Sequence, residues 1–253
     1  LAKDPDAANL FLEDGRWPTI AGWTALSQKR LDLSQLAQTL QRLADAGARD
    51  FYEGDIASAM VSDIRAKGGS LSLEDLKAYR ADLREAISIP YRGGVVHASN
   101  GLTAGPNLAE CLSMMEEAFK PGTSPDGKSY GAMVEALGAT YTNRLKNMGD
   151  QDAPHAPSCT THFSVVAGQG NKVAVTQTLL SIFSSRVVSP STGLLMNNGI
   201  MWFDPEPGKP NSLAPDKGCL MNVCPALGEI GGRRFAIGAS GGRKILPEIG
   251  RAH

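Results

Sequence analysis

Two threonines could share chemistry if the segment that carries them folds as a hairpin. Residues 160–166 and 172–180 are rich in Thr and Val and flank Gly168-Gln169-Gly170, a pattern that favours two antiparallel strands joined by a short loop. A loop centred on its glutamine places Thr160 opposite Thr178. Directly opposed β-carbons lie about 4.5–5.5 Å apart, so the two hydroxyls could form a hydrogen bond. A simple structural contact between neighbouring strands would satisfy the same pattern.

A threonine hydroxyl is a weak nucleophile until a base takes its proton. The sequence places no His and Asp pair to act as that base on Thr160. A threonine at the start of a chain carries its own base, an α-amine whose pKa is about 8. Cleavage between Cys159 and Thr160 would create this amine. The preceding stretch, residues 149–158, is polar and contains two prolines, which predicts a linker with accessible backbone.

A series of motifs resembles the small subunit of γ-glutamyltranspeptidases. In chain order they are Thr160 to Val166, Asn171 to Thr178, Gly193 to Asn198, Pro207 to Pro215 and Gly238 to Arg243. Upstream, residues 51–56, 68–72 and 75–79 resemble the end of that family's large subunit. The resemblance covers nearly the whole chain, whereas family members are considerably longer at both ends, so the chain looks like a fragment.

The resemblance implies an N-terminal-nucleophile hydrolase, a precursor that cleaves itself and then attacks an amide with the freed threonine. The expected fold is an α/β sandwich of the αββα type, incomplete at both ends, with the 160–180 hairpin at its centre. Residues 1–159 would be the mostly helical, large-subunit-like region, and residues 160–253 the β-rich, small-subunit-like region, together forming one domain. After cleavage the two subunits would remain paired.

By the same resemblance, Thr160 is the nucleophile, and Thr178 orients and activates its hydroxyl. Gly241 and Gly242 match paired glycines whose backbone N–H groups stabilise the tetrahedral oxyanion. Glycine suits this role because it lets the backbone approach the reacting atom, although a plain strand-to-helix turn would use the same residues. The uncleaved chain would be inactive, since its α-amine is still part of an amide.

The positions that would hold the α-amino and α-carboxylate groups of a glutamyl substrate depart from the family pattern. They read Leu180, Gly199, Trp202 and Met221-Asn222, so an indole, which only donates a hydrogen bond, replaces a carboxylate. We therefore expect a more apolar pocket, in which the substrate-binding residues are Asn198, Trp202 and Asn222. An Asn-Asn-Gly turn would explain Asn198 equally well.

The expected reaction is attack on a γ-glutamyl compound or a related, glutathione-like acyl amide, without a cofactor or metal. Residues 203–219 are proline-rich and lack the longer insertion that forms a lid in lidded transpeptidases. Water should therefore reach the acyl-enzyme, which favours hydrolysis over transfer to an acceptor. The alternative is a non-catalytic or unprocessed relative with a binding or structural role.

Two other side chains invite catalytic interpretations. His162 lies two residues along the predicted strand from Thr160, displaced by about 6.6 Å, which favours a packing or autoprocessing role over direct base catalysis. Gly238-Ala-Ser240-Gly-Gly242 fits the elbow of serine hydrolases, but that order needs an acid and then a histidine downstream. The only later histidine is His253, the last residue.

The remaining sequence is predicted to supply the helices and strands around these residues. Leu36, Leu40 and Leu43 stand at helical spacing and predict the buried face of a helix over 32–46. A second helical run starts at Ile56 and ends at Gly68-Gly69. Further expectations are a short helix after Ser72, a single edge or bent strand over 86–98 around Pro90, helices over 105–119 and 129–148, and a strand over 233–239.

Composition excludes several other classes of protein. Lys and Arg number 25 against 26 Asp and Glu, a net charge of −1 that disfavours binding to nucleic acid or an anionic membrane. The apolar runs fall far short of the roughly 18 residues that a membrane span needs. The four cysteines show no CxxC spacing and the four histidines do not cluster with them, which disfavours a zinc site. We expect that the chain does not begin where its gene does, so the cellular location stays unknown.

Overall fold

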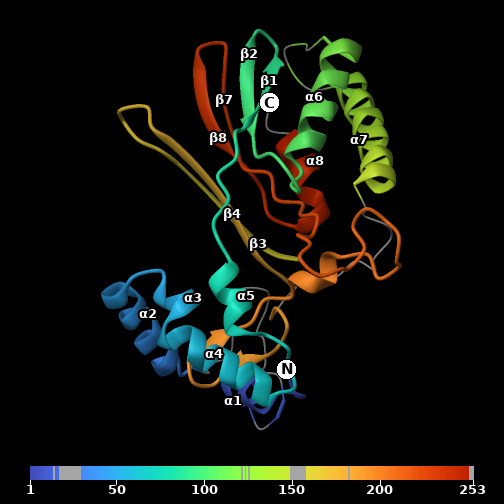
Figure 1. The fold of residues 1–253 in the computed structure, drawn as a ribbon. Helices are drawn as coiled ribbons and strands as arrows, with labels where there is room; N and C mark the ends of the chain where they lie inside the picture. The colour runs from blue at the N-terminus through green and yellow to red at the C-terminus, as the bar shows by residue number, and fades with distance from the viewer. Residues whose placement is uncertain are drawn as a thin grey trace. The chain divides into compact units, whose positions relative to one another are not determined.

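The computed structural model describes residues 1–13, 15–16, 30–120, 122, 124, 126–148, 158–181 and 183–250 (Figure 1). The chain forms two compact units, each discontinuous in sequence. The first unit spans residues 1–82 and 183–197, and the second spans residues 83–182 and 198–253. The boundaries of these two units differ from the predicted boundary at residue 160. The predicted boundary separates two subunits that cleavage would form, and it stays a prediction. Most of the predicted linker at 149–158 lies outside the described residues.

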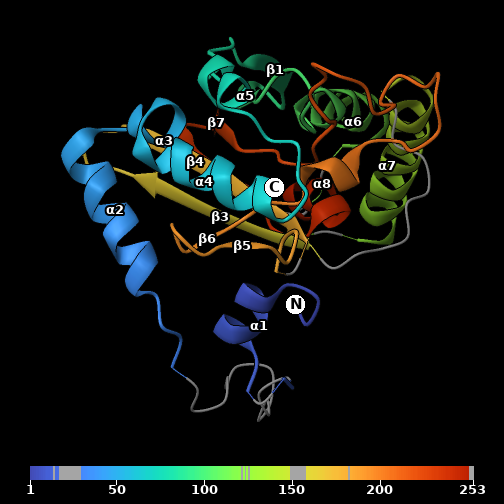
Figure 2. The same ribbon diagram turned by 60° about the horizontal axis from the view of Figure 1, so that its bottom comes forward.

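The first unit is mainly helical. Its elements are α1 (Pro5–Phe11), α2 (Ser34–Ala46), α3 (Asp50–Glu53), α4 (Asp55–Ala66), α5 (Leu73–Ala78) and the antiparallel pair β5 (Val188–Ser189) and β6 (Leu194–Leu195), which run side by side in Figure 2. The three helices predicted in this unit are confirmed. Ser72 and Asp75 form a capping box that starts α5, because each side chain accepts a hydrogen bond from the other residue's backbone N–H.

The buried face of α2 includes the predicted Leu36 and Leu43, which are partly buried, but not the predicted Leu40. Thr39 is 7% exposed and its hydroxyl donates to the carbonyl oxygen of Thr192 at 2.8 Å, whereas Leu40 is 55% exposed. The reason lies in the turn that contacts the helix. Gly193 has a positive φ, and a β-carbon there would lie 2.5 Å from the backbone nitrogen of Leu36. The turn's backbone thus packs directly on α2 and selects the face that carries Thr39.

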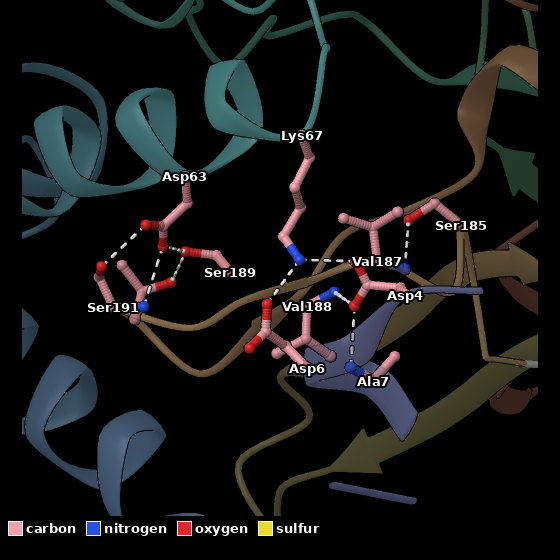
Figure 3. Close-up of polar contacts among 11 residues, drawn as sticks. Asp4, Asp6, Ala7, Asp63, Lys67, Ser185, Val187, Val188, Ser189 and Ser191 are labelled. Atoms are coloured by element: carbon pink, nitrogen blue, oxygen red, sulfur yellow. Dashed lines mark hydrogen bonds and ion pairs between the residues drawn. The ribbon is translucent and has the colours of Figure 1, made fainter. Parts of the chain in front are cut away.

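Hydroxyl groups of the segment 183–197 converge on a carboxylate of α4 (Figure 3). The Asp63 carboxylate accepts hydrogen bonds from the hydroxyls of Ser189 and Ser191, at 2.6 and 2.8 Å, and from the Ser191 N–H at 2.9 Å. Burial acts to raise the pKa of Asp63, but these hydrogen bonds outweigh it and hold the pKa below its usual value. The ionised carboxylate therefore holds this loop onto α4.

Lys67, one residue beyond the end of α4, bridges two carboxylates near the chain's first helix (Figure 3). Its Nζ lies 2.6 Å from the carboxylates of both Asp4 and Asp6. Asp4 is also the N-cap of α1, where its side chain accepts from the Ala7 N–H at 2.8 Å. The ion pairs thus connect the start of α1 to the end of α4.

The second unit contains a four-stranded antiparallel sheet in the order β1 (Ile87–Tyr91), β2 (Gly94–Ala98), β7 (Ala226–Ile230) and β8 (Arg233–Ile237). The helices α6 (Gly105–Ala118), α7 (Gly127–Asn147) and α8 (Ile245–Gly250) lie on one side of this sheet in Figure 1. The buried core includes Ile89, Val96, Leu108, Leu112 and Ile245. The helices predicted at 105–119 and 129–148 and the strand predicted from 233 are confirmed.

Residues 86–98 form two strands, so the prediction of one strand was wrong in number, although the first of the two, β1, is the edge strand that one of the alternatives expected. Arg92 and Gly93 have φ values of 50° and 71°, the conformation of a tight two-residue hairpin turn. Pro90 lies in β1, at the edge of the sheet, where its missing N–H can face away from the neighbouring strand. The turn residues therefore override the apparent continuity of the apolar pattern.

The predicted hairpin at 160–180 is confirmed as β3 (Ser158–Val166) and β4 (Lys172–Ser181). Within the described part of the chain it forms a two-stranded sheet of its own. Phe163, Val165 and Val173 remain about half exposed. The expected central, covered position of the hairpin is therefore not seen here. Outside the hairpin, β3 contacts β8 and the 3-10 turn η2 (Gly242–Lys244).

Candidate active site

Thr160 and Thr178 lie opposite one another in the β3–β4 hairpin, in the predicted register. The Thr160 hydroxyl donates to Thr178 Oγ1 at 3.2 Å. The loop that sets this register is closed at 2.8 Å by two hydrogen bonds, from the Ala167 N–H to Asn171 O and from the Gly170 N–H to Ala167 O. Gly170 has a φ of 88° there, which glycine adopts at little cost. Both threonines are half-buried.

The strand geometry becomes irregular just beyond the threonine pair. The register shifts between Ser158 and Thr160, and Leu180 on the facing strand has a φ of 76°. The Leu180 N–H donates to Thr178 Oγ1 at 2.9 Å. A hydroxyl oxygen has two acceptor lone pairs, so Thr178 Oγ1 can receive Leu180 and Thr160 at the same time.

His162 takes part in packing between β3 and the end of β8. Its Nδ1 lies 2.8 Å from Thr176 Oγ1, and its Nε2 lies 2.8 Å from Ser164 Oγ. Its ring occupies the space beside Gly238 that a β-carbon would fill. Burial lowers the pKa of His162, which favours the neutral ring at pH 7. Both ring nitrogens contact hydroxyls other than that of Thr160, as the packing interpretation expects.

Gly241 and Gly242 form the turn between β8 and α8. Their φ values are 114° and 60°, and a side chain at either position would strain the backbone. Gly242 begins η2, which lies beside β3, the strand of Thr160. This arrangement suits backbone N–H groups near a nucleophile and also suits a plain turn. His253, which a serine hydrolase centred on Ser240 would require, lies outside the described residues.

Asn198 forms hydrogen bonds with the end of β4. Its backbone N–H donates to Leu179 O at 3.3 Å, and its side-chain Nδ2 donates to Ser181 Oγ at 3.0 Å. Leu179 and Ser181 are the two chain neighbours of Leu180. The predicted substrate-binding residue therefore has a structural role on both sides of Leu180, which no sequence pattern indicated.

Trp202 and Asn222 carry buried donors that have no acceptor among the described residues, the indole Nε1 and the side-chain Nδ2. Trp202 ends the 3-10 helix η1 (Gly199–Trp202), and Asn222 is 5% exposed. A buried donor without an acceptor costs about 1–3 kcal/mol, so such atoms call for an explanation. Each of these two predicted substrate-binding residues thus has a buried donor that no described residue uses.

Two buried polar residues near these donors were not predicted from the sequence. Asn211 Nδ2 donates to Trp202 O at 2.6 Å, and Asn211 Oδ1 accepts from the Leu220 N–H at 3.0 Å. The buried Arg144 donates to Met221 O at 3.0 Å. Asn211 stands in a proline-rich stretch that reads as an ordinary turn, and Arg144 stands in an amphipathic helix. Neither position carries a local signal of burial for a polar side chain.

The described cysteines and acidic residues do not assemble into another reactive site. Across the described ranges, no three His, Cys, Asp or Glu side chains group as metal ligands, and no helix is long and apolar enough to cross a bilayer. Cys111, Cys219 and Cys224 are free thiols. Burial raises the pKa of Cys111 to about 11 and that of Cys224 to about 12. Neither thiol supplies a thiolate near neutral pH.

The chain has a mixed α/β fold, as the motifs predicted, and solved structures share it. A cephalosporin acylase from Bacillus halodurans shares this fold with a TM-score of 0.78 and 23% identity, over 94% of this chain and 48% of its own. The chain belongs to the γ-glutamyltranspeptidase family, whose model matches residues 1–159 and 154–250. The resemblance drawn from the sequence motifs is thereby confirmed.

Two relatives illustrate the range of the family. The chain is 28% identical to the glutathione hydrolase proenzyme of Escherichia coli (strain K12) over 274 residues, which covers 85% of this chain and 46% of that protein. It is 28% identical to the Acylase ACY 1 proenzyme of Pseudomonas sp. (strain V22) over 285 residues, which covers 98% of this chain and 50% of that protein. The chain spans about half the length of these curated relatives.

Proposed function

We propose that this chain carries the active site of an amide hydrolase in which Thr160, freed by self-cleavage, is the nucleophile. The observation that carries the proposal is the hydrogen bond from the Thr160 hydroxyl to Thr178 Oγ1, in the register predicted from the sequence. Family membership supports the reaction class, and both relatives are named proenzymes. The two segments matched by the family model meet at residues 154–159, directly before Thr160.

Self-cleavage begins with an N-to-O acyl shift at the 159–160 peptide bond. The Thr160 hydroxyl oxygen attacks the Cys159 carbonyl carbon, an ester bond forms as the C–N bond breaks, and the hydroxyl proton ends on the released amine. Water then hydrolyses the ester and leaves the Cys159 carboxylate on one chain and Thr160 at the start of the other. Until that happens the chain is inactive, because an amide nitrogen cannot serve as the base.

In the cleaved enzyme, the α-amine of Thr160 takes the hydroxyl proton as the oxygen attacks the substrate carbonyl carbon. The backbone N–H groups of Gly241 and Gly242 stabilise the oxyanion of the tetrahedral intermediate. The leaving amine departs with a proton, and water hydrolyses the acyl ester to regenerate Thr160. These steps require neither a metal nor a cofactor.

The substrate is a γ-glutamyl compound or a related acyl amide, and the pocket favours an acyl group that lacks an α-ammonium. Leu180 is buried and apolar. The unused donors of Trp202 and Asn222 suit carbonyl or carboxylate oxygens of the acyl group. Where the family pattern has a carboxylate that would pair with an ammonium, this chain has the indole of Trp202, which cannot accept a hydrogen bond. The two relatives are named a glutathione hydrolase and an acylase, and both names are compatible with attack on an acyl amide.

Hydrolysis is favoured over transfer to an acceptor amino acid. The segment from Asp204 to Leu213 bonds to itself, with the Asp204 N–H donating to Asn211 O at 2.9 Å and the Leu213 N–H to Asp204 O at 3.1 Å. Lys209 pairs with the Asp204 carboxylate at 3.2 Å. This compact segment has a local structural role and contributes no lid, so water has access to the acyl-enzyme.

Electrophoresis and mass spectrometry of the full-length protein test the proposal. We expect two fragments that meet at Thr160, and a single chain for Thr160→Ala. Release of a chromophore from γ-glutamyl and glutaryl anilides, with and without a dipeptide acceptor, tests the reaction. Strong acceleration by the dipeptide and strict preference for the γ-glutamyl compound would contradict the expected acyl group and hydrolysis. A single intact and inactive wild-type chain would support the alternative, a non-catalytic relative with a binding or structural role.

A further inference from the structure

Leu180 adopts a backbone conformation that its side chain disfavours, two residues beyond Thr178. Its φ of 76° lies in the left-handed region, where residues other than Gly, Asn and Asp are uncommon. The side chain is 5% exposed, so this is not a loose surface turn. Strained backbone of this kind persists only where the surrounding structure enforces it.

Asn198 supplies contacts that enforce the conformation. Its N–H donates to Leu179 O, and its Nδ2 donates to Ser181 Oγ. These hydrogen bonds hold the chain immediately before and immediately after Leu180. The peptide N–H of Leu180 is thereby kept in the direction of Thr178.

The conformation of Leu180 determines one of the hydrogen bonds that the hydroxyl oxygen of Thr178 accepts. It accepts the Leu180 N–H at 2.9 Å and the Thr160 hydroxyl at 3.2 Å. With one acceptor direction occupied by a backbone N–H, the other is directed at Thr160. A fixed acceptor holds the Thr160 hydroxyl in one orientation, and correct orientation before reaction lowers the barrier to attack.

We propose that Leu180 is a positioning residue for the reaction: its left-handed backbone, held by Asn198, aims its N–H at Thr178 Oγ1 and so presets the Thr160–Thr178 pair for attack. This inference rests on the proposed role of Thr160 as the nucleophile. Because the effect comes from the backbone, substitutions at residue 180 should rank by their tolerance of positive φ and not by their size.

Leu180→Ile tests this ranking, because it keeps the same side-chain atoms but branches at Cβ, which disfavours positive φ. In the full-length protein we expect cleavage of the 159–160 bond to slow by about tenfold, and kcat of the matured enzyme to fall with KM nearly unchanged. Leu180→Gly should cleave faster than Leu180→Ile, although the loss of a buried side chain should lower its melting temperature. Leu179→Ile is the matched control at a half-exposed neighbour.

Cleavage rates and melting temperatures are measured on the same set of proteins. Faster cleavage of Leu180→Gly than of Leu180→Ile, with Leu179→Ile like wild type, supports the inference. Equal cleavage of Leu180→Ile and wild type, or rates that simply follow the melting temperatures, would overturn it and leave the proposed function intact. If wild type stays uncleaved, the proposed function fails and the inference fails with it. Should Leu180→Ile not fold, Leu180→Asn against Leu180→Thr makes the same comparison, since Asn tolerates positive φ and Thr does not.

Discussion

The imidazole ring of His162 fills the space that a side chain on Gly238 would need. An added β-carbon would lie 2.2 Å from the ring Cε1 and 2.3 Å from Nδ1. Gly238 directly follows β8 and leads into the turn of Gly241 and Gly242. The ring therefore sets how closely the Thr160 strand approaches the start of that turn, and glycine is required at 238 for close contact and not for an unusual φ.

Gly238→Ala should force the ring away from Thr176 and Ser164. We expect the free energy of unfolding to fall by about 1–3 kcal/mol, as for other overpacked sites. Urea unfolding of the full-length protein measures the loss. Gly168→Ala is the control, because a β-carbon at Gly168 meets open space, and its effect should be within about 0.5 kcal/mol.

The same contact can be isolated with a double-mutant cycle. Combining His162→Ala with Gly238→Ala removes the ring that the new β-carbon strikes. The double variant should be more stable than the sum of the two single losses predicts, by at least about 0.5 kcal/mol. Additive losses would show that the two residues do not act through this contact.

Thr178→Val removes the acceptor of the Thr160 hydroxyl and keeps the shape of the side chain. We expect kcat/KM of the matured enzyme to fall by about a hundredfold, which is within the range of effects typical of general acid–base catalysis. Thr161→Val is the matched control on the other face of the hairpin, where residue 161 pairs with Gln177. An activity of Thr178→Val close to that of Thr161→Val would remove Thr178 from the mechanism.

Asn222→Leu separates stability from function. The Asn222 Nδ2 is buried without an acceptor among the described residues, so an apolar replacement should leave the free energy of unfolding unchanged or raise it by about 1 kcal/mol. The KM for acyl anilides should rise, because the proposed pocket loses a donor. Asn211→Leu is the contrasting variant: its amide bonds to Trp202 O and the Leu220 N–H, and its loss should cost about 1–3 kcal/mol. Equal destabilisation by both variants would contradict the assignment.

Asp63→Asn should destabilise the protein at pH 7 but not in strong acid. The folded-state pKa of Asp63 lies below its ordinary value of 3.8, so the carboxylate stabilises the fold above that pH, and the contribution is lost as the pH falls through the folded-state pKa. We expect a loss of about 1–3 kcal/mol at pH 7 in urea unfolding, shrinking below pH 3.8. Asp55→Asn, on the same helix with a side chain that is 79% exposed, should have little effect at either pH. A loss that does not vary with pH would show that hydrogen-bond shape, and not charge, holds the loop.

Local patterns in the sequence predicted the parts of the fold that depend on neighbours along the chain. Thr160 and Thr178 could be aligned because a hairpin loop sets the pairing of both strands, and the start of α5 could be placed because Ser72 and Asp75 cap it directly. These features need no knowledge of distant residues. The same holds for the long helices of the second unit, whose spacing of apolar residues is regular over several turns.

The features that were missed depend on contacts between distant segments. Thr39 is buried because the backbone around Gly193 packs on α2, more than 150 positions away along the chain. The positive φ of Leu180 follows from hydrogen bonds to Asn198, and Leu gives no hint of that conformation. The apolar pattern of residues 86–98 suggested one continuous strand, although Gly93 and Gly94 within this segment are typical turn residues. In each case a tertiary contact or a turn outweighs the local preference.

The short loop from Ala167 to Asn171 makes the candidate site vulnerable to insertions and deletions far from it. Side chains on a strand alternate between its two faces, so a gain or loss of one loop residue that is taken up as a shift in pairing would bring Gln177 or Leu179 opposite Thr160. Thr178 would then point to the other face, although no residue of the pair had changed. The pairing of the two threonines thus depends on the length of this loop as well as on the identities of residues 160 and 178.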